Sequence, residues 1–295
     1  MDNKTINKTI IENIKKEYDE IFYKLIRLDR SRVLYIFLES YNDLIKRLKI
    51  DQRPYQEILI DEYKEIFLRV INFEAYDNFR ITLYQFEELL LSLDKENSIS
   101  VGLLDTIFIL IEKSGKYVIT NKTSNVAISY IAFVDSLMKK MHCIYKDGMW
   151  KQRILDVIFS ISVEAIELKN NEIIRNCSNT IGWISKEALD RGDYSIFCYS
   201  LDIATILYKL VSDFGFEDDV LIFIGTLFII IGAYACSRKK SPELNYIEKK
   251  INEFENKQFL VKSKNIRYYQ ARYWDDTFEG NAEKFINDFY ERIQK

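Results

Sequence analysis

Glycine and proline are scarce in this chain, which holds only 9 Gly and 2 Pro in 295 residues. Both residue types interrupt helices and build tight turns, so a chain poor in them has few places for the short turns of β-hairpins. Tyrosine and phenylalanine, by contrast, occur 20 and 19 times. We therefore expect an almost entirely helical protein and exclude architectures built from β-hairpins.

The sequence also lacks the motifs that cradle phosphates or carry an activated nucleophile. It contains no GxxxxGK[ST], GxGxxG or GxSxG pattern. His142 is the only histidine, so HExxH zinc sites, paired Glu-x-x-His di-iron sites and Cys₂His₂ fingers are excluded. We predict no catalytic, cofactor-binding or metal-binding residues, and an enzyme is the least favoured class of function.

Cysteine pairs and a signal segment are missing as well. The four cysteines, Cys143, Cys177, Cys198 and Cys236, form no CxxC motif, which is typical of reduced thiols packed in a core. The N-terminus is polar and then amphipathic, without the apolar region of a secretory signal. These features predict a cytoplasmic location.

The overall charge is nearly balanced, at −3, while 48% of the residues are hydrophobic and 29% are charged. This composition supports a sizeable core and excludes disorder for most of the chain. It argues against attraction of the whole protein to nucleic acid or anionic lipid, although a local basic patch remains compatible with it.

Apolar residues recur at the spacing of amphipathic helices through most of the chain, which predicts about a dozen helices. The expected helices cover about 10–25, 31–48, 54–73, 78–93, 100–113, 124–142, 150–169, 171–190, 194–212, 217–236, 241–255 and 281–293. Gly148, Gly192 and Gly215 fall in gaps between them. Ser241 is expected to cap a helix that has Pro242 in its first turn.

Helix pairs recur about every 40 residues in this pattern. The expected fold is all-α, with antiparallel helix pairs arranged either as a helical repeat of the α-solenoid kind or as an irregular bundle. No linker rich in Pro, Gly or Ser divides the chain, so we expect a single domain over 1–295. The best candidate for an internal boundary is 113–124. Gly115 is placed to end a helix there, and we expect 117–120 to be extended. The C-terminal half is more apolar and is expected to be more central.

The segment 220–236 carries no charge over 17 residues and is followed by Arg238, Lys239 and Lys240. Two interpretations remain open. A helix of this length spans about 25 Å, which is short for a bilayer, so the segment fits a buried core helix. The basic residues after it match the cytoplasmic flank of a membrane span.

A basic and aromatic stretch follows, within a region that has a local charge of +6 over 237–272. Its candidate site residues are Lys262, Lys264, Arg267, Tyr268, Tyr269, Arg272, Tyr273 and Trp274. Such a stretch can bind phosphates and stack on bases, dock on a membrane surface or a partner, or simply pack its aromatic side chains on the helices.

Three hypotheses for function follow. The leading one is a scaffold or regulator that binds a protein or peptide in a groove between helix pairs, because tyrosine is favoured at recognition surfaces. The alternative is a membrane-associated protein at the cytoplasmic face, anchored by 220–236 or docked through 238–274. The third is nucleic-acid or phosphate binding through 262–274. No small-molecule ligand is indicated.

Overall fold

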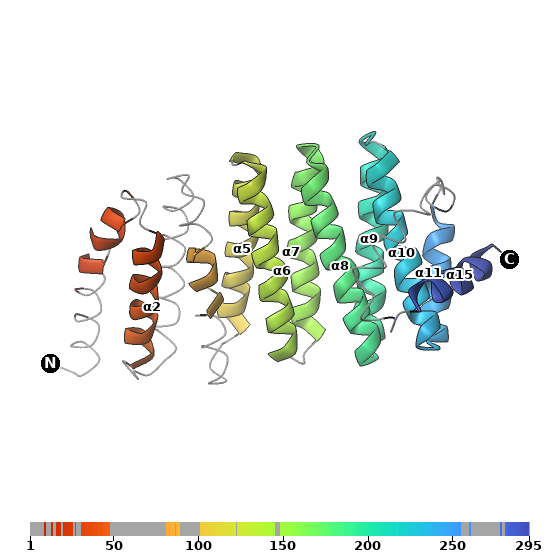
Figure 1. The fold of residues 1–295 in the computed structure, drawn as a ribbon, viewed down its shortest axis with the longest axis horizontal. Helices are drawn as coiled ribbons and strands as arrows, with labels where there is room; N and C mark the ends of the chain where they lie inside the picture. The colour runs from red at the N-terminus through yellow and green to blue at the C-terminus, as the bar shows by residue number, and fades with distance from the viewer. Residues whose placement is uncertain are drawn as a thin grey trace. The chain divides into compact units, whose positions relative to one another are not determined.

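The computed structural model describes residues 9, 13, 16–18, 20–25, 27, 31–47, 81–85, 87–88, 101–121, 123–144, 148–216, 218–254, 260, 278 and 281–294. Every regular element among them is an α-helix (Figure 1). The chain divides into two compact units, 1–144 and 145–295. The predicted all-α fold is confirmed; the prediction of a single domain stays a prediction.

Apart from α5, the helix bounds agree closely with the hydrophobic periodicity. The first unit contains α2 (Ser31–Arg47), α5 (Val101–Asn121) and α6 (Ser124–Ile144). The second contains α7 (Gly148–Glu167), α8 (Asn171–Arg191), α9 (Tyr194–Asp213), α10 (Asp218–Ser237), α11 (Ser241–Asn252) and α15 (Ala282–Ile293). The helix predicted at 54–73 and most of that predicted at 78–93 lie outside the described residues.

Helix α5 corrects the expectation of a break at Gly115. The helix continues through Gly115 to Asn121, so 117–120 is helical rather than extended. Val118 and Ile119 are buried, and α5 packs against α6. Their burial outweighs the roughly 1 kcal/mol that a glycine costs inside a helix. The units divide after Ile144, and 113–121 lies within α5.

The same turn closes each of the four helices from α7 to α10. A residue just after each helix is left-handed: Lys169 (φ 52°), Gly192 (69°), Gly215 (67°) and Lys239 (54°). In each case the next residue donates its N–H to a carbonyl five residues back, as Asp193 does to Ala188 at 2.8 Å. This is the Schellman arrangement, which satisfies the last carbonyls of a helix and reverses the chain.

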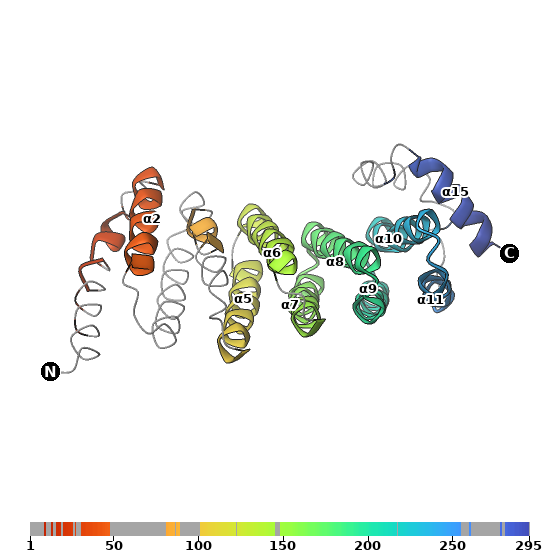
Figure 2. The same cartoon turned by 90° about the horizontal axis from the view of Figure 1, so that it is seen from below.

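These turns produce a regular repeat in the second unit. Equivalent helices begin 46 or 47 residues apart, at 148 and 194, at 171 and 218, and at 194 and 241. The repeat is therefore longer than the 40 residues expected from the sequence. Figure 2 shows α7, α9 and α11 in one row and α8 and α10 in a second row. Each helix contacts the next along the chain and its equivalent in the neighbouring pair, as in α-solenoids.

Helix α10, which contains the uncharged segment 220–236, forms the centre of this unit. It packs against α8, α9, α11 and α15, and 15 of its 20 residues are buried. Gly232 faces the ring of Phe289 on α15, and a Cβ atom at this position would overlap that ring. The absence of a side chain at Gly232 therefore allows α15 to pack closely against α10.

Candidate interaction face

The basic and aromatic residues singled out in the sequence, 262–274, lie outside the described residues. The roles proposed for Lys262, Lys264, Arg267, Tyr268, Tyr269, Arg272, Tyr273 and Trp274 therefore stay predictions. Ser241 does not cap α11 as expected, because the capping position is Lys240 and no side chain bonds the helix start.

The cysteines of the second unit have raised thiol pKa values. Burial raises the pKa of Cys177 to about 12, and burial is also the main cause of the raised pKa of Cys198 and Cys236. High thiol pKa values lower the fraction of reactive thiolate. Among the described residues, no group of three His, Cys, Asp or Glu side chains is placed to hold a metal ion.

Tyrosine–aspartate hydrogen bonds join neighbouring helix pairs. Three tyrosines each donate to an aspartate 43 or 44 residues earlier: Tyr199 to Asp156, Tyr234 to Asp190 and Tyr246 to Asp202. The repeat is 46 or 47 residues long. Each tyrosine therefore lies about one helical turn before the position that is equivalent to its aspartate. The hydrogen bond to Asp156, together with burial, raises the pKa of Tyr199 to about 12.

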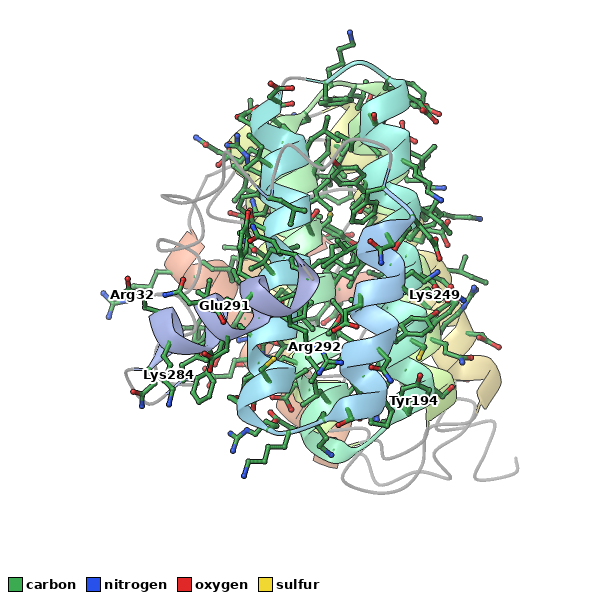
Figure 3. All side chains as sticks on the ribbon, turned by 90° about the vertical axis from the view of Figure 1, so that its right-hand side faces the viewer. Arg32, Tyr194, Lys249, Lys284, Glu291 and Arg292 are labelled. Atoms are coloured by element: carbon green, nitrogen blue, oxygen red, sulfur yellow. The ribbon has the colours of Figure 1, made fainter. Side chains whose placement is uncertain are left out.

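Charged pairs connect helices across similar separations. Lys151 of α7 donates to Asp193 Oδ2 at 2.7 Å, and the lysine is buried. Arg175 of α8 pairs with Asp219 of α10, and Arg292 of α15 pairs with Glu248 of α11. Figure 3 shows Arg292 between these last two helices. The pairs set the register between successive helix layers.

One group of these side chains lies where α9 meets α11, and we call it the α9–α11 face. It consists of Tyr194, Cys198, Asp202, Glu243, Tyr246 and Lys250. Tyr194 is 45% exposed, and its ring packs edge-on against Tyr246 with 6.3 Å between ring centroids. Figure 3 labels Tyr194 on the side of the molecule formed by these two helices.

Tyr246 is held by charged neighbours on both sides. Its hydroxyl donates to Asp202 at 2.7 Å, and the Lys250 ammonium lies 5.4 Å from its ring centroid. Lys250 also bonds Asp202 (2.7 Å) and Glu253 (3.1 Å). Burial alone would lower the pKa of Lys250, but these hydrogen bonds raise it, so the ammonium stays charged. The face thus presents a rigid aromatic pair beside fixed charges.

Glu243 contributes a carboxylate with an unusual environment. Its side chain projects from the first turn of α11, the residue is 6% exposed, and Oε2 is buried without a hydrogen-bond partner. Hydrophobic periodicity does not single out the residues of this face. A different sequence pattern indicates Asp202 and Tyr246: an aspartate is repeatedly followed by a tyrosine 43 or 44 residues later.

Comparisons with known proteins identify no family. No family model matches the chain, and no curated protein does. A solved structure described as a "Circular tandem repeat protein with novel repeat topology and enhanced subunit contact surfaces" aligns with 98% of this chain and 77% of its own, with a TM-score of 0.33 and 9% identity. A likeness this distant does not bear on function.

Proposed function

We propose that this protein is a helical scaffold that binds a protein or peptide partner through the α9–α11 face. The exposed Tyr194, packed on a Tyr246 that Asp202 and Lys250 hold in place, carries the proposal. Rigid tyrosines supply contact area at little entropic cost and are enriched among the residues that dominate binding energy. The stacked helix pairs support it, because such stacks present extended binding surfaces.

A photo-crosslinking amino acid tests this function directly. Placed at Tyr194, it is expected to give a discrete adduct with one partner in cells. Placed at Asn179, which is exposed on α8, it provides the matched control and is expected to give none. The purified partner should then bind the Tyr194→Ala variant about tenfold more weakly, a loss of roughly 1.4 kcal/mol. Equal adducts at both positions, or undiminished binding by the variant, would contradict the proposal.

We further propose that the scaffold acts in the cytoplasm with α10 as its core helix. In the part of the chain that the structure describes, two helices, α9 and α10, are long and apolar enough to cross a membrane. However, 83% of the most apolar 18-residue stretch of α10 is buried, which supports the core role. The alternative is a membrane anchor. Fractionation with an alkaline wash separates the two, because an anchor is retained in the washed membranes and a soluble scaffold is not.

A further inference from the structure

Among the residues of the α9–α11 face, Glu243 is the one with a buried side-chain oxygen that lacks a hydrogen-bond partner. A buried carboxylate oxygen without a hydrogen bond costs free energy that folding must offset elsewhere. The third residue of a helix commonly bonds the N–H of the capping residue. Here that N–H, of Lys240, is already donated to the Ala235 carbonyl at 3.0 Å. Oε2 of Glu243 is therefore left without a donor.

The neighbours of Glu243 on α9 define what kind of donor would fit. Tyr194 and Cys198 lie close enough to interact with each other, and both lie within the electrostatic reach of Glu243. Asp202 adds a second carboxylate near Cys198, but it is already bonded to Lys250 and Tyr246. A group that pairs with Glu243 should thus be a cationic hydrogen-bond donor that can also pack against an aromatic ring.

We propose that the α9–α11 face receives an arginine side chain of the partner polypeptide, with the guanidinium on Glu243 and its plane against Tyr194. This inference rests on the proposed function and names the chemistry that the partner must carry. A guanidinium is planar, weakly hydrated and able to donate in several directions, so it pairs with a buried carboxylate and stacks on a tyrosine at once.

Other occupants fit the same residues less well. A metal ion needs several ligands, and the described residues place no group of three His, Cys, Asp or Glu side chains together. A lysine ammonium is a compact, strongly hydrated charge that loses more on leaving water. Tyr194, which lies within electrostatic reach of Glu243, is 45% exposed, so a partner side chain can approach this part of the face from solvent.

A random-peptide library displayed on phage, selected on the full-length protein, tests the inference. The selected peptides are expected to share an arginine. Replacing that arginine by citrulline, which keeps the shape and removes the charge, should weaken binding about tenfold or more. Glu243→Gln should produce the same loss, whereas Glu187→Gln, on α8, should leave the affinity unchanged. Free arginine should compete only at much higher concentration than the peptide.

The outcomes separate this inference from the proposed function. Peptides that need Tyr194 but bind equally with citrulline, or to the Glu243→Gln variant, would overturn the arginine site and leave the scaffold role intact. If no selected peptide depends on Tyr194, both fall. Circular dichroism checks the fold of each variant. If Glu243→Gln fails to fold, Glu243→Asp, which keeps the charge and shortens the side chain by one methylene, is expected to weaken the arginine peptide selectively; unchanged affinity would overturn the site.

Discussion

At the scale of single residues, aspartates connect the helix layers. Asp193 accepts from the Ile196 N–H as the cap of α9, and its other oxygen accepts from Lys151. Asp156, Asp190 and Asp202 each accept from a tyrosine of the next helix pair. A carboxylate has two oxygens with several lone pairs, so one side chain can serve two elements.

Asp193→Ala is expected to lower the free energy of unfolding by about 2–3 kcal/mol, because it removes a helix cap and leaves the buried ammonium of Lys151 unpaired. Chemical denaturation measures the loss. Asp193→Asn keeps the cap, and Lys151→Met removes the charge that needs pairing. The combination of these two changes should therefore be much less harmful than Asp193→Ala; an equally large loss would contradict the pairing role.

Alkaline unfolding reports on the tyrosine–aspartate bonds. The pKa of Tyr199 is raised in the folded state from 10.0 to about 12, so between these values the folded protein holds a proton that the unfolded chain has lost. Stability therefore falls as pH rises from about 10 to about 12. Tyr199→Phe should make this fall less steep, because unfolding of the variant releases up to one proton fewer. A fall of unchanged steepness, measured by denaturation at several pH values, would show that Tyr199 does not contribute.

At the scale of elements, the turns matter as much as the helices. All four turns after α7 to α10 use a left-handed residue, but only two of them place glycine there. Lysine is strained in this conformation because its Cβ approaches the backbone. The two lysine turns are consequently sites where the sequence is less than optimal for its own fold.

Lys239→Gly is expected to raise the free energy of unfolding by about 0.5–1 kcal/mol by relieving this strain. Gly192→Ala is the matched opposite change, at a position with open space around a Cβ, and should cost about 1 kcal/mol through the backbone alone. Thermal melts measure both. If Lys239→Gly lowers the melting temperature, the lysine side chain has a stabilising role that outweighs the strain.

The docking of α15 depends on the absence of a side chain at Gly232. Gly232→Ala would place a Cβ against the buried ring of Phe289 and should weaken this docking. Hydrogen exchange of the α15 amides is expected to quicken more than that of α8. Adding Phe289→Leu should restore part of the protection, because the smaller side chain makes room. Uniform loss of protection across the unit would instead indicate global unfolding.

At the scale of the whole molecule, the burial of α10 links stability to location. The helix passes between α8, α9, α11 and α15, and Ile230 is fully buried. Its apolar surface is therefore covered by protein within the second unit. The same composition in an isolated helix would be compatible with a membrane span.

Ile230→Arg separates these two possibilities. In a core helix, an unpaired charge is expected to unfold the protein, so the variant should lose its cooperative melt and aggregate. Ile206→Arg, at an exposed position on α9, should leave the melt nearly unchanged and is the control. If the wild-type protein is instead recovered in alkaline-washed membranes and the Ile230→Arg variant is released from them, the core role of α10 would be wrong.

The sequence by itself determined the helical class and most helix boundaries in the second unit, because periodic burial and glycine-marked turns are local patterns. It also indicated that 220–236 is either core or membrane-spanning. Only the tertiary structure decided that α5 continues through Gly115, because burial against α6 overrides the local signal. The α9–α11 face likewise required the fold, since Asp202 and Tyr246 lie 44 residues apart and meet only when consecutive helix pairs stack.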